Sequence, residues 1–433
     1  MATKQLSAAS RMLGRLLVSF SMAGVLVLTG KSPAVGADPR SWGFNHYGQL
    51  GDGTQVNRAQ PTKVKSGSGD FVNVDAVSVG STHTLAVKAG AVWGWGCNDL
   101  GLLGIGRNGG WYTQPVAANS PANGGIIAVS AALHHSLALR EDGKVLAWGY
   151  NSKGQLGDGS TAMRTNPVYV MKNPSEQLTG VIAISAAADF SLALLNDGTV
   201  WAWGSNFVYQ LGNPIGYGLP HPYPEPVRNA EDTGFLQNVV FISAGGGDES
   251  HAISLAVTAD GRAWAWGANG CGQLGRGTTS FYGDWRPMPV LDPDGGHMQN
   301  VRALSGGGAL FTLALKADGS VWAWGNDIYG CLGDGDGGGG MSLVPVRVLN
   351  SNFDPLSNIV KIGAGGSSSI ALKSDGTVWT WGSNNLGQLG LGDLNNRSVA
   401  YEVIDPGSPT GYLQMVIDAA VGGGVHNVVR VLP

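Results

Sequence analysis

Three histidines of the 433-residue sequence occupy one position of a repeated pattern, each opening an alternating stretch such as HTLAVK: His83, His135 and His426. Histidine can transfer protons near neutral pH and is a common metal ligand. Other copies of the pattern place Phe or Ser there (Phe190, Phe311 and Ser368). Because an active site would not be spread around the chain in this way, we predict a structural role for these histidines, in packing or in hydrogen bonding to the backbone.

The acidic residues give a weak chemical signal. Asp334 and Asp336, in GDGDGGGG, could bind calcium, but the bidentate acid of a complete calcium loop is missing. We therefore favour a solvated glycine loop and predict neither a metal site nor a cofactor. Asp248 and Glu249 are the other carboxylates that stand out, and the chain has no Gly-x-Ser-x-Gly and no His-Glu-x-x-His motif. The sequence thus favours a protein that is not an enzyme.

The three cysteines are far apart and lack Cys-x-x-Cys spacing: Cys97, Cys271 and Cys331. That spacing does not predict a zinc site. Cys271 and Cys331 occupy related loops of neighbouring repeats, so they are the pair that a disulfide would join. The alternative is three unpaired residues, buried or in loops, and the sequence leaves both open.

The elements that would carry these residues are repeats. The dodecapeptide WGYNSKGQLGDG, at 148–159, has six other versions, which begin at Trp42, Trp95, Trp203, Trp266, Trp324 and Trp381. The units share one order of elements: a strand of small residues, an alternating strand, a tight turn that is Asp-Gly in five of them, a strand ending in Trp-Gly, and a loop of the Gly-Gln-Leu-Gly type. Asp-Gly between alternating apolar runs predicts a hairpin, since both turn positions favour positive φ.

Seven such units predict an all-β fold, a seven-bladed β-propeller. The tryptophans should fill the wedges between blades, and the Leu of each loop should be buried. The first unit begins at its third strand and the last ends at its second, so residues near 426–432 should pair with residues near 39–43. We assign the propeller to residues 38–433.

Residues 1–37 have the order of a secretory signal peptide. Basic residues precede an apolar run at 16–30, and small residues lead to a cleavage site at Ala37. The run is short for a membrane span, which needs about 20 residues; an uncleaved anchor is the alternative. Cleavage removes four basic residues and moves the net charge from −4 to −8. We expect a secreted or periplasmic protein with no membrane span, and the acidic mature chain does not favour nucleic acid.

The repeats resemble those of the regulator of chromosome condensation (RCC1) family, through stretches such as HHSLALREDGKVLAWGYNSKGQLGDG at 134–159 and SIALKSDGTVWTWGSNNLGQLG at 369–390. The resemblance implies a seven-bladed propeller. It also implies a possible role in nucleotide exchange on a small GTPase, as in the nuclear founder of the family. This chain departs from that founder in its signal sequence and its negative charge. Secreted bacterial propellers that bind proteins are the better analogy.

Off-pattern aromatic residues gather in loops that follow the third strand of several units, and these loops should share one face. The candidates for partner binding are Trp111, Tyr112, Tyr217, Tyr223, Phe281, Tyr282 and Trp285. Interfaces enrich Trp and Tyr as anchors, although long loops also bury their own aromatic residues. We predict a monomeric, non-catalytic scaffold that binds a protein partner; an exchange factor and a binder of carbohydrate or envelope polymers are the alternatives.

Overall fold

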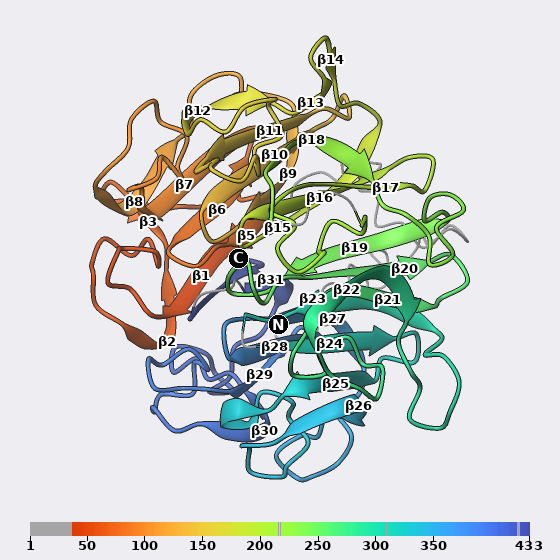
Figure 1. Ribbon diagram of the computed structural model, residues 1–433. Helices are drawn as coiled ribbons and strands as arrows, with labels where there is room; N and C mark the ends of the chain where they lie inside the picture. Colours follow the sequence, from red (N-terminus) through yellow and green to blue (C-terminus); the bar gives the residue numbers. More distant parts are fainter. Residues whose placement is uncertain (1–36, 215, 217, 309, 422–424) are drawn as a thin grey trace.

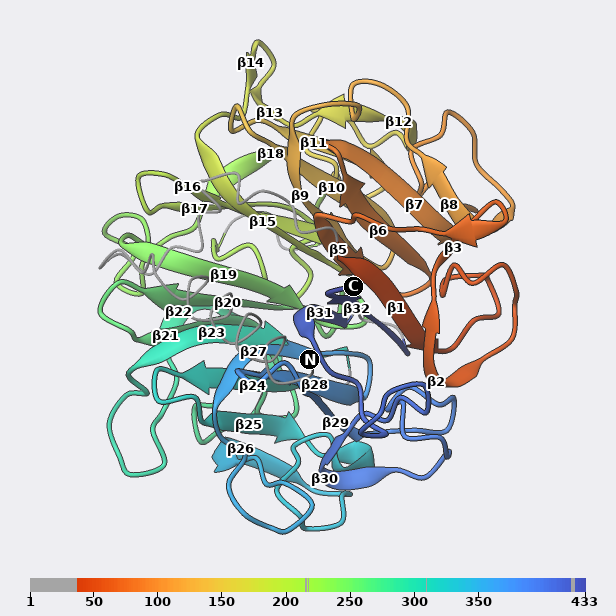
Figure 2. The same ribbon diagram turned by 180° about the vertical axis from the view of Figure 1, so that it is seen from behind.

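The computed structural model describes residues 37–433 except 215, 217, 309 and 422–424. Seven four-stranded antiparallel sheets surround a central axis, and the chain visits them in order round the ring (Figure 1; Figure 2). Each sheet is one blade, numbered here in chain order, with its first strand nearest the axis. The predicted seven-bladed propeller is confirmed.

The strands of blades 1 to 3 have these bounds: β5 (Ala76–Val79), β6 (His83–Lys88), β7 (Ala91–Cys97), β8 (Trp111–Ala117); β9 (Ile126–Ala131), β10 (His135–Arg140), β11 (Val145–Gly149), β12 (Arg164–Tyr169); β15 (Val181–Ala187), β16 (Phe190–Leu195), β17 (Val200–Gly204), β18 (His221–Pro226). Two small hairpins are added outside the blades: β3 (Lys65–Ser66) with β4 (Gly69–Asp70), and β13 (Met171–Asn173) with β14 (Glu176–Gln177). The second hairpin projects at the rim in Figure 1.

Blades 4 to 6 are built in the same way: β19 (Val239–Gly245), β20 (Ile253–Thr258), β21 (Ala263–Asn269), β22 (Ser280–Pro289); β23 (Val301–Gly306), β24 (Phe311–Lys316), β25 (Val321–Asn326), β26 (Met341–Arg347); β27 (Ile359–Ala364), β28 (Ser368–Lys373), β29 (Val378–Gly382), β30 (Arg397–Glu402). One short 3₁₀ helix, η1 (Ile328–Gly330), lies in a loop of blade 5. Among the described residues no helix is long and apolar enough to cross a membrane.

Blade 7 joins the two ends of the propeller. Its inner strands are β31 (Val416–Val421) and β32 (His426–Val431), and its outer strands are β1 (Asp38–Gly43) and β2 (Arg58–Lys63). β1 and β32 pair in continuous antiparallel register, from Asp38 opposite Val431 to Gly43 opposite His426. The predicted closure of the ring is therefore confirmed.

A repeated set of hydrogen bonds, which we call the bracket, joins neighbouring blades. In blade 2 the indole of Trp148 is fully buried and donates to the carbonyl of Leu102 in the blade 1 loop, at 2.7 Å. The hydroxyl of Ser136 donates to the same carbonyl, at 2.9 Å. All seven blades repeat this indole bond, from Trp42, Trp95, Trp148, Trp203, Trp266, Trp324 and Trp381. The tryptophans thus fill the wedges as predicted, and a polar bond fixes each one.

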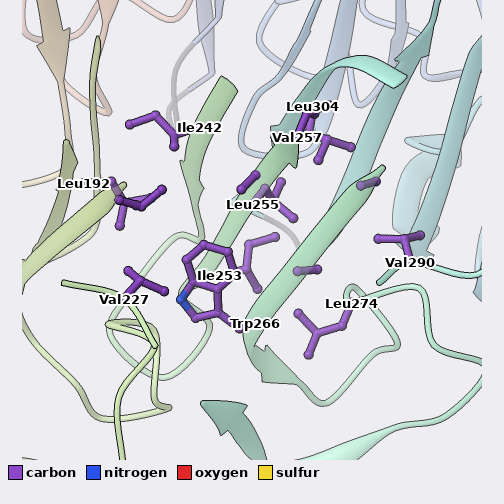
Figure 3. Packing of buried hydrophobic residues seen from close by; sticks show 14 of the residues in the cluster. Leu192, Val227, Ile242, Ile253, Leu255, Val257, Trp266, Leu274, Val290 and Leu304 are labelled. Atoms are coloured by element: carbon purple, nitrogen blue, oxygen red, sulfur yellow. The ribbon is translucent and has the colours of Figure 1, made fainter. Parts of the chain in front are cut away.

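Figure 3 shows this packing around Trp266, whose ring lies beside Val227 of blade 3 and Ile253 of its own blade. The glycine that follows each loop leucine allows the close approach. At Gly157, where φ is +66°, an added Cβ would come within 2.8 Å of Nε1 of Trp203. A side chain at this position would push the indole out of the wedge, because interiors are packed without spare volume.

The three repeat-position histidines extend the bracket in part of the ring. His135 Nε2 lies 2.7 Å from Ser191 Oγ in the next blade, and His83 and His426 make the same contact with Ser136 and Thr84. Because each hydroxyl already donates to a loop carbonyl, the imidazole must be the donor. The structural role predicted for these histidines is confirmed.

The three cysteines are free, and Cys97 and Cys331 are buried. Cys331 replaces the loop glutamine of other blades and supplies the carbonyl that accepts from Trp381. The suggested Cys271–Cys331 disulfide is therefore not formed, and the alternative of unpaired residues holds. Residues 1–36 of the predicted signal peptide lie outside the described residues, whereas Ala37 is buried and its carbonyl accepts from the N–H of Val74.

Candidate binding face

Antiparallel strands place the loops after the first and third strands of every blade on one side of the ring, which we call the loop face. Each loop after a third strand packs on the outer strand of the next blade. In blade 7, for example, Gly48 lies against Thr113 of β8, and in blade 2 Gly154 lies against Pro222 of β18. The residues of the loop face are thus held by two blades at once.

Trp111 lies at the seam between blades 7 and 1. It opens β8 opposite Cys97, and its ring is 46% exposed. The ring centroid lies 5.3 Å from that of His46 and 5.4 Å from that of Tyr47, both in the blade 7 loop. Sequence reasoning missed His46 and Tyr47, which lie inside the regular repeat. The result is a small aromatic platform, in which the Trp111 indole contacts the rings of His46 and Tyr47.

Phe281 and Tyr282 form a second, more exposed pair at the start of β22. Their exposed fractions are 90% and 70%, and their rings meet edge to face at 5.3 Å. The next residue, Gly283, has φ of +74°, and a Cβ there would meet the carbonyl oxygens of Val208 and Gly267 at 2.5 and 2.7 Å. The backbone at Gly283 is therefore closely packed against Val208 of the blade 3 loop and Gly267 of β21, directly after the two exposed side chains.

The remaining predicted residues are less available. Tyr112 is half-buried, with Arg107 donating to its hydroxyl at 3.1 Å, and Trp285 is also half-buried. Tyr223 is turned towards blade 2, where it lines a groove of about 420 Å³ with Asp158, Arg164, Tyr169 and Met171 among others. Tyr217 lies outside the described residues. Blades 1 and 4 are three places apart in the ring, so the candidates form separate patches on the loop face.

The acidic residues that stood out in the sequence have hydrogen-bonding or ionic partners. Glu249 pairs with Lys153 of the blade 2 loop at 2.7 Å, and Asp248 pairs with His251 at 2.8 Å. Asp189 accepts from Gln155 and lies 2.9 Å from His134 Nδ1. Glu249 therefore links its loop to the blade 2 loop, whereas Asp248 is bonded within its own loop, to Ser250 and His251. This is not the cluster of free carboxylates that acid–base hydrolysis would use.

The blade 5 loop contains a group of carboxylates that form no ion pair with any basic residue in the described part of the chain. Asp327, Asp334 and Asp336 each offer an oxygen within 4.8 Å of the others. Burial, followed by the effect of the neighbouring acids, raises the pKa of Asp327 to about 7. Sequence reasoning identified Asp334 and Asp336 but missed Asp327, although its replacement of the Asn in Trp-Gly-x-Asn could have revealed it. The three acids could hold a cation.

The fold and its loops define a class: a ring of repeats in which a constant bracket supports variable loops on one face. The RCC1-like domain family matches residues 38–429, and the chain belongs to this family. The chain is 28% identical over 360 residues to the ultraviolet-B receptor UVR8 of Arabidopsis thaliana, covering 83% of this chain and 76% of that protein. It is 30% identical over 306 residues to human E3 ubiquitin-protein ligase HERC2, covering 70% of this chain and 6% of the ligase.

Solved structures of similar fold include Prp20p from Saccharomyces cerevisiae, with a TM-score of 0.75 and 22% identity over 96% of this chain and 97% of that one. Human WBSCR16 has a TM-score of 0.72 and 24% identity over 91% of this chain and 98% of that one. Prp20p is described with its binding to Gsp1p and histones. These relatives are eukaryotic, and at such identity the structures establish the fold alone.

Proposed function

We propose that this chain is a non-catalytic propeller that binds a protein partner through the loop face. The observation that carries the proposal is the Phe281–Tyr282 pair, two large aromatic side chains that are exposed to solvent next to a closely packed glycine, Gly283. Such groups lose little conformational entropy on binding and are frequent hot spots. The Trp111 platform offers a second anchor of the same kind.

The wider family supports binding as the function. Prp20p is described as binding Gsp1p and histones, and a further structure has Kap60 bound to it. These partners belong to that protein. For this chain they support the general use of an RCC1-like propeller as a platform for another protein, without saying which.

We also propose that the chain is an exported bacterial protein that acts outside the cytoplasm as a monomer, without nucleic acid. The basic, apolar and small-residue order of residues 1–37 supports export. Cleavage after Ala37 would leave Asp38 as the first residue, at the start of the closing strand β1. Sequencing the N-terminus of the protein recovered from the medium or periplasm tests this, with Asp38 expected. Recovery of an intact chain from the cytosol would contradict it.

The binding experiment compares four immobilised proteins in their capture of exported host proteins. The parent is set beside a Phe281→Ser, Tyr282→Ser double variant and a Trp111→Ala variant. The matched control is Tyr412→Ser, because Tyr412 is 43% exposed and follows the fourth strand of blade 6, on the opposite face. We expect a protein that the parent and the control retain and that the double variant loses at least tenfold.

Other outcomes separate the alternatives. Equal retention by all four proteins would remove the loop face from binding. Retention of polysaccharide in place of protein would favour the carbohydrate or envelope-polymer alternative, since exposed aromatic rings also stack on sugars. The exchange-factor alternative has one supporting observation, the fold shared with Prp20p, and it requires a cytosolic location. Acceleration of nucleotide release from a host GTPase would establish it.

A further inference from the structure

In six of the seven blades a buried asparagine closes the loop that follows the third strand. In blade 2 the Asn151 Oδ1 accepts the N–H of Leu156 at 2.9 Å, and its Nδ2 donates to the carbonyls of Ser160 and Ala162 at 3.0 Å. The Oδ1 bond to the leucine recurs at Asn45, Asn98, Asn151, Asn206, Asn269 and Asn384. One amide group thus satisfies both the donor and the acceptors of the loop.

Blade 5 has an aspartate in this place. Asp327 is 1% exposed, and its Oδ1 accepts the N–H of Leu332 at 2.7 Å, so the side chain has the orientation of the asparagines. Its Oδ2 therefore takes the place of the Nδ2 donor. That oxygen is buried and has no hydrogen-bond partner in the described part of the chain. A buried carboxylate oxygen without a donor carries an uncompensated desolvation penalty. The Asp336 carboxyl group lies beside it, so either a proton shared between the two acids or a bound cation would compensate this penalty.

At the neighbouring positions, blade 5 lacks a basic residue that blades 7, 2 and 6 have, and its loop aspartate is left without an arginine partner. In blades 7, 2 and 6 an arginine lies opposite the Gly of Trp-Gly and pairs with a loop aspartate: Arg58 with Asp52, Arg164 with Asp158, and Arg397 with Asp393. In blade 5 the residue opposite this glycine is Ser342. Asp334 follows Leu332-Gly333 as Asp158 follows Leu156-Gly157, but it forms no ion pair with a described Lys or Arg.

The third acid replaces a hydroxyl. Thr54 and Ser160 donate to the loop aspartates of blades 7 and 2, at 2.7 and 2.8 Å. Asp336 holds the corresponding position in blade 5, two residues after Asp334. Its backbone carbonyl also corresponds to those of Thr54 and Ser160, which accept from the asparagine Nδ2. Compared with blade 2, blade 5 thus has carboxylates in place of the amide donor and the hydroxyl, and Ser342 in place of the arginine. It keeps the loop aspartate as Asp334, so three carboxylates lie together.

We propose that Asp327, Asp334 and Asp336 bind a divalent cation of the calcium class, which replaces the asparagine amide in closing the blade 5 loop. The oxygen separations of up to 4.8 Å suit ligands around one Ca²⁺, whose bonds to oxygen are about 2.3–2.6 Å long. Calcium accepts irregular sets of carboxylate and carbonyl oxygens, whereas Mg²⁺ requires a near-ideal octahedron. The buried, unpartnered Oδ2 of Asp327 is the observation that distinguishes this group from an ordinary acidic surface.

The cation would fix the contact between blades 5 and 6. The N–H of Gly335, inside the loop, donates to the carbonyl of Ser398 in β30 at 2.9 Å. Gly330, at the other side of the loop, has no space for a side chain against Ser398, since a Cβ there would come within 2.6 Å of its Cα. Binding should therefore stabilise the folded protein as any ligand of the native state does.

The test uses the purified protein freed of metal with a chelator. Calorimetric titration with CaCl₂ should show one site with a dissociation constant on the order of 10⁻⁴ M, and saturating Ca²⁺ should raise Tm by about 2 °C or more. MgCl₂ should bind at least tenfold more weakly. Asp327→Asn restores the residue of the other six blades, so this variant should fold, lose the calcium effect and keep at least the calcium-free Tm of the parent.

A second variant guards against an indirect effect of Asp327→Asn. Asp336→Ser restores the hydroxyl of blade 2 and should weaken Ca²⁺ binding at least tenfold. The proposal is overturned if the parent shows no Ca²⁺ binding at 10 mM (about 100 times the expected constant). It is also overturned if Asp327→Asn binds as tightly as the parent, because the cation would then lie elsewhere. If the parent binds no Ca²⁺, a proton shared between Asp327 and Asp336 would take the place of the cation, and the acids would serve only the internal structure of the loop.

Discussion

Blades 2 and 5 share a framework but differ at several polar positions of the loop that this framework supports. Trp148 and Trp324 are both fully buried and donate to a carbonyl of the preceding blade, at 2.7 and 2.8 Å. The loop of blade 2 then contains Asn151, Asp158 and Arg164, whereas blade 5 has Asp327, Asp334 and Ser342 at the corresponding places. One backbone loop is thus closed by two different kinds of chemistry.

The pKa values of corresponding acids follow this difference. Burial tends to raise the pKa of Asp158, but hydrogen bonds from Arg164 and Ser160 hold it below its ordinary value. Burial raises the pKa of Asp334 as well, and the nearby Asp336 carboxylate adds to the rise. The repeat fixes where a side chain lies, while its neighbours decide what charge it can carry.

The largest expected effect tests whether the two frameworks are equivalent. Trp148→Ala and Trp324→Ala should each lower the free energy of unfolding by about 3–5 kcal/mol, through the cavity and the lost indole bond. Urea denaturation of both variants measures this, and the two losses should agree within about 1 kcal/mol. A much smaller loss in one blade would show that its wedge can collapse and that the frameworks are not equivalent.

The next largest effect is expected from acidic pH, which should lower the stability of the protein through blade 2 but not through the corresponding position of blade 5. At the start of the second strand blade 2 has His135, whose pKa burial lowers to about 4, and blade 5 has Phe311. The unfolded chain binds a proton near pH 6.5 and the folded chain does not, so stability falls as pH drops from about 6.5 towards 4. This histidine contributes up to about 1.4 kcal/mol per pH unit in that window.

His135→Gln keeps a neutral side chain that can hydrogen-bond at every pH. Its loss of stability between pH 7 and pH 4, measured by urea denaturation, should be smaller than that of the parent by up to about 3 kcal/mol. His83 and His426 are buried in the same way, which lowers the pKa of each to about 3. In the variant these two histidines should still contribute to the loss of stability at acidic pH. Identical pH profiles for parent and variant would show that His135 is solvated in solution.

Exchange of the loop residues should have opposite effects in the two blades. Asn151→Asp removes the donor to two carbonyls and brings a carboxylate to Asp158, so we expect a loss of about 2 kcal/mol. Asp327→Asn should cost nothing when the chelator is present. Chemical denaturation in the presence of the chelator EGTA compares the two variants. Equal losses would mean that each loop is adapted to its own residue and that asparagine cannot replace aspartate in blade 5.

The smallest effect is expected on the loop face itself. Phe281→Ser should change stability by less than about 0.5 kcal/mol, because the ring is 90% exposed. Trp285→Ala should cost more, since that side chain is half-buried. Thermal unfolding of both variants provides the measurement. A large loss at Phe281 would assign its ring to packing within the molecule and weaken its role as an anchor.

The fold could be predicted from the sequence because its signal is repeated seven times. The Trp-Gly motif, the Asp-Gly turns and the incomplete first and last units specified the blades and the closure. The sequence identified only part of the calcium candidate. Asp334 and Asp336 stand out as an acidic run, but Asp327 is recognised only when it is compared with the buried asparagines at the same position of the other blades. Burial of its Oδ2 depends on contacts that a local pattern does not contain.

The aromatic residues show the limit more plainly. Trp111 and Tyr282 are both off-pattern aromatic residues in loops after a third strand. The Trp111 ring contacts His46 and Tyr47 of another blade, whereas Tyr282 is 70% exposed. Tyr223, from the long loop of blade 3, turns instead towards the groove beside blade 2. Exposure is decided by the neighbouring blade, which can lie hundreds of residues away for the closing blade and some 50 residues away elsewhere.

The pairing of β1 with β32 has a consequence for how the protein is made. The indole of Trp42 bonds a carbonyl 346 residues further along the chain, so its wedge cannot be completed until nearly the whole polypeptide is present. A growing chain is an open arc with an unpaired strand at its N-terminal end. Assembly therefore finishes in one late step, and the protein should be most vulnerable to proteases and to mispairing with other chains just before the two ends meet.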